Sequence, residues 1–330
     1  MIKLLSKIRE INRVSSEYGL NREVNQRIQM IIQDKLLRHR LQKSIEDSSL
    51  IEATHSAIFF KQLERRYAEQ LEKTATVDND WVKSEMPRVI WWCWLQGEDQ
   101  APGLVKECLK SLRHNLPDYD IQVITWDNLN NYIQVPKKIL DKFNAKWING
   151  ANFSDIIRLM LLVQYGGIWV DATVFCTDDR LIRAIEKKNM FMFQNVMTTN
   201  SNVIKMSSWM IASKKNNPYL EEVSTLLTQY YIDSPYTEDY FICHLLLSLF
   251  ATKYQSIWDD MQLYNNINPH IMQYMMNKRY NEELFNRVTE KSSVHKLNHH
   301  ISLATGNTFY HHLEELNYLK QFCEANRTRK

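Results

Sequence analysis

Several features are missing from this chain of 330 residues, and each absence argues against a class of protein. No G-x-G-x-x-G follows a predicted strand, which argues against a dinucleotide-binding oxidoreductase. There is no C-x-x-C pair to indicate zinc, and the five scattered cysteines look like reduced core residues. The net charge of +3 is too small to indicate a nucleic-acid-binding protein. We find no secretory signal and no apolar run of about 18 residues or more. We therefore predict a cytoplasmic protein.

The first 75 residues read as an α-helical region. Residues 1–14 place apolar side chains on one broad face and basic ones largely elsewhere, as in a helix that lies at a membrane surface. Two interpretations are open: a peripheral contact with the cytoplasmic face of the inner membrane, or packing on this protein or a partner chain, which is the commoner fate of such helices. The polar segment 74–86 then ends at Pro87. We predict an N-terminal helical region over residues 1–80 and a second domain over 81–330.

The second domain shows an alternation of strands and helices. Apolar runs at 88–94, 121–126 and 168–170 have the length of buried strands, and helical patterns lie between them. This alternation indicates an α/β fold with a parallel sheet flanked by helices. Later patterns predict strands at 190–193, 209–212 and 293–297, and helices at 179–188, 218–231 and from Thr237 to about residue 252.

The most informative stretch runs from residue 151 to 177 and joins an apolar helix to an apolar strand through Gly166–Gly167. Glycine ends a helix readily because it adopts the left-handed conformation without steric cost. Three charged side chains interrupt this stretch, namely Asp155, Arg158 and Asp171. The helix is apolar nearly all round, so its charges need partners. Asp155 and Arg158 stand three residues apart and share a face.

Each of these residues has a functional and a structural interpretation. Asp171 follows a buried strand, and ligands in α/β sheets bind outside the carboxyl ends of strands, so it is placed to hold a metal or a nucleotide hydroxyl. Alternatively, it satisfies its own backbone in an Asx-turn. Ser154 and Asp155 are candidates for capping the helix and complementing its positive end, with Arg158 as the internal partner of Asp155.

A resemblance to a known family rests on residues 153–177, which read FSDIIRLMLLVQYGGIWVDATVFCT. This run is similar to the signature of bacterial capsular polysaccharide synthesis proteins, a branch of the glycosyltransferase family 32 sugar transferases with a D-x-D sugar-binding region. The resemblance covers roughly residues 87–310, and ordered blocks over such a length make chance agreement improbable. The other blocks are PRVIWWCWLQGEDQAP at 87–102, SSWMIAS at 207–213, DYFICHLLLS at 239–248, NPH at 268–270 and VHKL at 294–297.

The resemblance implies a GT-A fold, in which a Rossmann-like sheet binds a nucleotide-sugar, usually through a divalent metal such as Mn²⁺ or Mg²⁺. One departure bears on the metal. This chain has Asp171–Ala172–Thr173 where the family at large has Asp-x-Asp. Thr173 offers a neutral oxygen where a metal prefers a carboxylate, so we expect weaker metal binding from this motif.

The family resemblance also implies the activity and the site. We expect a retaining transfer of a sugar from a UDP-sugar to a lipid-linked glycan acceptor in capsular or other surface polysaccharide synthesis. For single residues the alternatives are core packing of either tryptophan, helix capping by Asp239, and a surface position for His295–Lys296. The predicted site residues are Asp155, Arg158 and Asp239 for catalysis; Trp92, Trp94, Asp155, Arg158, Asp171, Thr173, His295 and Lys296 for binding the UDP-sugar; and Asp171 and His295 for the metal.

Two other functions stay open from the sequence. In the first, the protein is a catalytically inactive subunit that binds glycan or nucleotide through a transferase fold. In the second, its basic N-terminal helices make it a membrane-surface scaffold of a synthesis complex. Loss of activity in an Asp171→Asn variant that still folds would oppose the first. Liposome binding that persists after deletion of residues 1–75 would oppose the second.

Overall fold

The structure is a computed structural model that describes residues 10, 12–73, 80–195 and 203–317. The amphipathic segment 1–14, apart from its last residues, and Cys323 lie outside the described residues. The helices that lie wholly within the described residues are α2 (Val24–Ser44), α3 (Ser48–Arg66), α4 (Ala68–Glu72), α5 (Asp80–Lys83), α6 (Gly103–Asn115), α7 (Leu129–Tyr132), α8 (Lys137–Asn144), α9 (Gly150–Tyr165), α10 (Arg180–Ile185), α11 (Pro218–Asp233), α12 (Ile242–Ala251), α13 (Gln255–Asp260) and α14 (Glu282–Lys291). Short 3-10 helices are η1 (Asn21–Glu23), η2 (Glu98–Gln100), η3 (Asn268–His270) and η4 (Met272–Tyr274).

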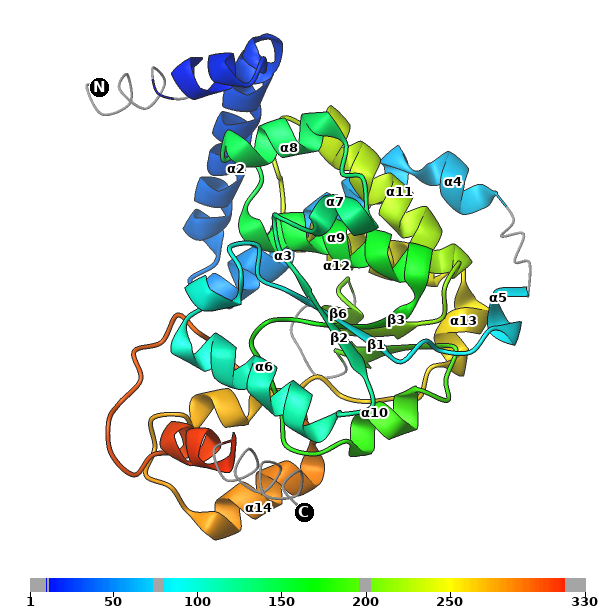
Figure 1. Ribbon diagram of the computed structural model, residues 1–330. Helices are drawn as coiled ribbons and strands as arrows, with labels where there is room; N and C mark the ends of the chain where they lie inside the picture. Colours follow the sequence, from blue (N-terminus) through cyan, green and yellow to red (C-terminus); the bar gives the residue numbers. More distant parts are fainter. Residues whose placement is uncertain (1–9, 11, 74–79, 196–202, 318–330) are drawn as a thin grey trace.

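A five-stranded sheet lies at the centre of the molecule, with strand order β2-β1-β3-β6-β5 (Figure 1). Strands β2, β1 and β3 are parallel, and β6 runs antiparallel to both of its neighbours. A second sheet pairs β4 with β7 in antiparallel register. The predicted α/β class with a preceding helical region is confirmed. The strands are β1 (Val89–Cys93), β2 (Asp120–Ile124), β3 (Gly167–Val170), β4 (Val174–Cys176), β5 (Met190–Gln194), β6 (Met206–Ser213) and β7 (Val294–Lys296).

The central sheet is buried on both faces, because helices pack against each of them. Successive side chains of a strand point to opposite sides and so enter different cores. In β1, Trp91 belongs to the core formed with α9, α11 and α12, whereas Ile90 and Trp92 belong to the core formed with α6 and α10. Trp169 of β3 lies on the α9 side. This arrangement explains why the strands read as nearly continuous apolar runs in the sequence.

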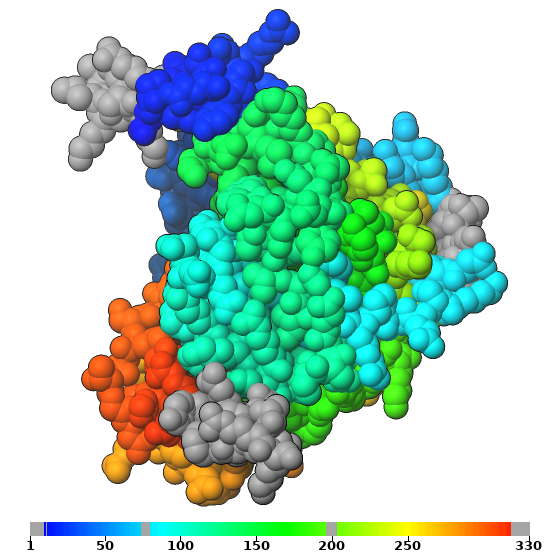
Figure 2. Space-filling model, in the orientation of Figure 1, coloured from blue at the N-terminus to red at the C-terminus, as the bar shows by residue number. Residues whose placement is uncertain are grey.

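The N-terminal helices share the first of these cores. Phe59 and Leu63 of α3 are buried in the same cluster as α9, α11 and α12. In Figure 2 the N-terminal helices (blue) and the C-terminal segment (orange to red) lie at opposite ends of one face of the molecule.

The predicted domain boundary at residue 80 stays a prediction. Among the described residues, no helix is both long enough and apolar enough to cross a membrane.

The helix α9 begins and ends where its backbone groups find partners. Its N-terminal cap is Asn149, whose side chain accepts a hydrogen bond from the Asn152 nitrogen at 2.8 Å, so Ser154 is not the cap. At the other end Gly166 and Gly167 have φ angles of +70° and +94°, as the glycine pair predicted.

We expect Gly166→Ala to lower the free energy of unfolding by roughly 3 kcal/mol or more. A Cβ there would lie 2.6 Å from the Lys215 nitrogen and 2.9 Å from the Ser213 oxygen, both backbone atoms. The control is Gly19→Ala: Gly19 has a φ of +69° but nothing within 4 Å of a Cβ, so it costs only roughly 1 kcal/mol. Urea unfolding measures both. Equal costs would mean that the backbone beside Gly166 relaxes.

Candidate functional site

A cavity of about 550 Å³ lies at the carboxyl ends of β1 and β3. We call it the charged cavity. Its lining includes Trp94 from the loop after β1, Arg158 from α9, Asp171 and Thr173 from the turn after β3, and Lys296 from β7. Five of the predicted site residues, distant in the sequence, are therefore brought to one cavity.

Asp171 is the centre of the polar contacts in the charged cavity. Its Oδ1 accepts hydrogen bonds from Arg158 Nη2 at 3.0 Å and from Trp169 Nε1 at 2.9 Å. Its Oδ2 accepts from Lys296 Nζ at 2.9 Å, and the same ammonium donates to Thr173 Oγ1 at 2.7 Å. The Asp171 side chain thus binds two cations. In an Asx-turn it would instead accept a hydrogen bond from its own backbone.

Arg158 joins Asp171 to a second buried carboxylate. Its Nη1 lies 3.1 Å from Asp155 Oδ1 and donates to the Ser208 carbonyl oxygen at 2.6 Å. The Ser208 hydroxyl also contacts Arg158 and lies 3.1 Å from His244 Nε2, which accepts a hydrogen bond from the Ser208 nitrogen at 3.3 Å. Both Asp155 and Arg158 are almost fully buried. The predicted pairing at i, i+3 is present, and it is part of a larger network.

The two carboxylates of this network differ in their pKa values. Burial raises the pKa of Asp155 to about 6, although Arg158 opposes this effect. Burial also acts to raise the pKa of Asp171, but Lys296 and Arg158 outweigh it and hold the pKa below its usual range. Burial lowers the pKa of His244 to about 4, assisted by Arg158, so this imidazole is neutral at pH 7. The result is an ionised Asp171 between two cations.

The family resemblance predicted a divalent metal at Asp171. Both oxygens of that carboxylate already accept from nitrogen donors, and it is the one acidic residue among the described lining residues of the charged cavity. Within the described parts of the chain, no group of three or more His, Cys, Asp and Glu is placed to hold a metal. The side chains around Asp171 fit a divalent cation poorly, because an ion bound to that carboxylate would be repelled by the positive charges of Lys296 and Arg158.

His295, the second predicted metal ligand, is not brought together with Asp171. It is fully buried, does not line the charged cavity, and has its Nε2 3.5 Å from Thr177 Oγ1. The reason is the alternation along β7, which sends Lys296 toward Asp171 and the preceding side chain the opposite way. Burial lowers the pKa of His295 to about 4.

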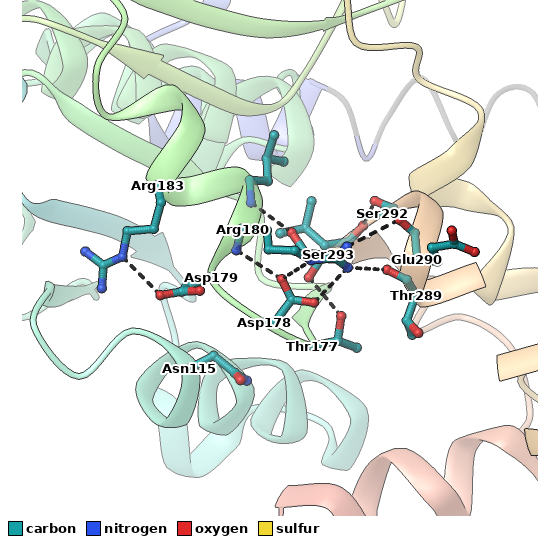
Figure 3. A network of polar contacts seen from close by, with 12 residues as sticks. Asn115, Thr177, Asp178, Asp179, Arg180, Arg183, Thr289, Glu290, Ser292 and Ser293 are labelled. Atoms are coloured by element: carbon teal, nitrogen blue, oxygen red, sulfur yellow. Dashed lines mark hydrogen bonds and ion pairs between the residues drawn. The ribbon is translucent and has the colours of Figure 1, made fainter. Parts of the chain in front are cut away.

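On that opposite side lies the network of Figure 3, which ties the start of α10 to the end of α14. Arg180 donates to both oxygens of Asp178, at 2.8 and 2.9 Å, and to the Thr289 carbonyl oxygen at 2.5 Å. The Ser293 hydroxyl accepts from the Leu181 nitrogen at 3.1 Å. These contacts hold β7 in place, and so support the position of Lys296 indirectly.

Asp239 also lies away from the charged cavity. Its Oδ2 accepts from Ser56 Oγ at 2.7 Å and lies 3.4 Å from His55 Nδ1, while its Oδ1 accepts from the Phe241 nitrogen at 2.7 Å. The hydrogen bond with Asp239 is the main cause that raises the pKa of His55. Asp239 therefore links α3 to the turn before α12, a helix that begins at Ile242 rather than near Thr237.

The two predicted tryptophans occupy different places. Trp92 is fully buried in the core with α6 and does not line the charged cavity. Trp94 does line it, with its ring centroid 5.7 Å from that of His299. Its Nε1 is buried and has no hydrogen-bond partner in the described residues. Trp94 is the one of the pair that a ligand can reach.

Several residues of the site were not among those predicted from the sequence, namely Ser208, Tyr240, His244, His270 and Gln273. Ser208 and His244 belong to the Arg158 network, and the other three line the charged cavity. A signal was available for four of them. All but Gln273 fall within the blocks at 207–213, 239–248 and 268–270 that carry the family resemblance.

The fold and the site together define an α/β protein with a charged cavity at the carboxyl ends of its strands, which is where α/β sheets commonly bind their ligands. Residues 38–313 match the model of a family described as capsular polysaccharide synthesis protein. The match spans most of the 330 residues, and the chain belongs to that family. It begins within α2, so the family also includes N-terminal helices that the expected range of 87–310 left out.

Other comparisons are more distant. Among solved structures, the chain is similar to one titled PaToxG Glycosyltransferase, with 12% sequence identity, a TM-score of 0.39, and coverage of 72% of this chain and 95% of that one. The sequence matches none of the curated proteins searched.

Proposed function

We propose that this protein is a glycosyltransferase that moves a sugar from a UDP-sugar to a lipid-linked glycan acceptor during synthesis of capsular or other surface polysaccharide. Membership of the capsular polysaccharide synthesis family supports the process. The observation that carries the chemistry is the position of Asp171, Arg158 and Lys296 in one cavity at the carboxyl ends of the strands. As the family resemblance implies, the anomeric configuration is retained.

Sugar transfer requires stabilisation of a departing diphosphate beside an electron-poor anomeric carbon. In our proposal Lys296 and Arg158 supply positive charge to the diphosphate, and Asp171 holds both cations in position and binds a donor hydroxyl. Asp155 does not line the cavity, and its role is to fix the guanidinium of Arg158 through their ion pair. Trp94 lies against the nucleobase or sugar. These roles consist of positioning and charge stabilisation, and the proposed reaction uses no covalent nucleophile.

Lys296 also bears on whether the reaction requires a divalent metal. We propose that Lys296 supplies the charge that a divalent cation supplies in other sugar transferases, since its ammonium contacts both Asp171 and Thr173. A single positive charge attracts a diphosphate less strongly than a divalent ion, and Arg158 adds the second charge.

The test is release of UDP from a panel of UDP-sugars by the purified protein, with manganese or with a chelator. We expect slow hydrolysis of one donor and rates within about twofold of each other under the two conditions. Lys296→Ala should lower the rate at least about tenfold in both. Loss of activity on chelation would show that a metal is required. Nucleotide binding without turnover would favour the inactive binding subunit, and absence of both would contradict the donor class.

A further inference from the structure

A transferase needs a second site, because the acceptor hydroxyl must reach the anomeric carbon of the bound donor. Three other cavities are candidates for this site. The cavity beside Arg180 and the cavity between α2 and α3 share no lining residue with the charged cavity. A cavity of about 260 Å³ does share one, namely His270, and we call it the His270 cavity.

We propose that the His270 cavity binds the terminal sugar ring of the acceptor glycan. This inference rests on the proposed transferase function and assigns the acceptor to the segment that holds η3 and η4. Two kinds of observation carry it: the chemistry of the lining, and the fixed position of His270 where the two cavities meet.

The lining has the groups that bind carbohydrate. Tyr274 is 74% exposed and Ile267 is 43% exposed, so an aromatic ring and an aliphatic side chain face solvent at the cavity. An aromatic face packs on the C–H face of a pyranose, while amides pair with its hydroxyls. Gln194 and Asn266 supply these amides. Within the described residues, the Gln194 side chain and Asn266 Nδ2 make no hydrogen bond, and Asn266 Oδ1 accepts from Trp209 Nε1 at 2.8 Å.

His270 is held so that one nitrogen remains for a ligand. Its Nδ1 donates to the Asn266 carbonyl oxygen at 2.6 Å, and its ring lies edge-on to Trp209 with centroids 5.8 Å apart. Burial lowers the pKa of His270, so the ring is neutral at pH 7 and Nε2 carries a lone pair. Nε2 has no partner in the described residues and accepts a hydrogen bond from the acceptor hydroxyl at the entrance to the charged cavity.

The backbone around the cavity is well supported. The Asn266 nitrogen donates to the Gln194 carbonyl oxygen at 2.9 Å, and the Gln194 nitrogen donates to the Tyr264 carbonyl oxygen at 2.8 Å. These bonds join the end of β5 to the segment that leads into η3. The cavity is thus preformed, which reduces the entropic cost of binding a sugar.

The first experiment measures binding without a donor. Saturation-transfer NMR on the full chain would use methyl glycosides of glucose, galactose and N-acetylglucosamine. We expect at least one glycoside to bind wild type and the Leu263→Ala control, whose altered side chain is 63% exposed nearby but does not line the cavity. Binding should weaken roughly tenfold in Tyr274→Ala. Wild type that binds none of them, or equal binding by all three proteins, would overturn the proposal.

The second experiment measures transfer to the bound glycoside and UDP release in its absence. We expect Tyr274→Ala and His270→Gln to lower the ratio of transfer to hydrolysis roughly tenfold, with an increased acceptor KM, and Leu263→Ala to leave it unchanged. An unchanged ratio in both variants would overturn the acceptor site. Binding that depends on Tyr274, in a protein that hydrolyses no donor, would support the sugar site and overturn the transferase instead.

Discussion

Asp171→Asn is expected to lower donor turnover by roughly 10²–10³-fold while the protein stays folded. Asparagine has one side-chain oxygen. With that oxygen toward Arg158 and Trp169, the amide nitrogen, which is a donor, faces the Lys296 ammonium. The ammonium therefore loses the charge that orients it toward the donor. UDP release gives the rate, and thermal unfolding with circular dichroism gives the fold.

The matched control is Asp127→Asn, which removes an exposed carboxylate that follows strand β2 of the same sheet and lies outside the charged cavity. We expect its rate to equal that of wild type. If Asp171→Asn keeps full activity, Asp171 takes no part in the reaction and the proposed site is wrong. If it unfolds, Thr173→Val becomes the informative variant, since it removes only the hydroxyl that accepts from Lys296.

Arg158→Met is expected to lower the free energy of unfolding by about 3–5 kcal/mol. The guanidinium lies between Asp155 and Asp171, at 3.1 and 3.0 Å, and it is nearly inaccessible to solvent. Its removal leaves two carboxylates without their shared cation, and this costs more than the net contribution of the intact ion pairs. Urea unfolding at pH 7.5 measures the loss.

Two variants separate this effect from a general loss of charge. Arg287→Met breaks an exposed pair with Glu283, in which the arginine side chain is 72% exposed, and should cost less than about 0.5 kcal/mol. Adding Asp155→Asn to Arg158→Met should restore part of the stability, because it removes one of the unpaired charges. A loss in Arg158→Met as small as that in Arg287→Met would show that the buried network contributes little.

The loss should also depend on pH. Arg158 lowers the pKa of both Asp155 and Asp171, so without it both carboxylates take up protons at a higher pH in the folded protein. A raised folded pKa adds stability as the pH falls through it. The difference in stability between wild type and Arg158→Met should therefore shrink as the pH falls from 7.5 to 5. A constant difference would mean that the cost comes from packing instead.

The sequence by itself determined the local order of the site. The apolar run of α9, the glycine pair and the short strand β3 predicted a buried helix, a turn and a strand, and the structure has them at Gly150–Tyr165 and Gly167–Val170. The spacing of Asp155 and Arg158 predicted their contact, because residues three apart on a helix are neighbours. The position of Asp171 at a strand end followed from the same patterns.

Only the tertiary structure decided which distant side chains meet Asp171. Lys296 is 125 residues away in the sequence, and it contacts Asp171 because β7 pairs with β4 in the register that sets Val174 opposite Lys296. A register shifted by one residue would turn the His295 side chain toward Asp171 instead. Period-two alternation excludes both from one site, but no local pattern says which of them enters it. Helix and strand periodicity fix the face on which a side chain lies, whereas its partner depends on how separate segments pack.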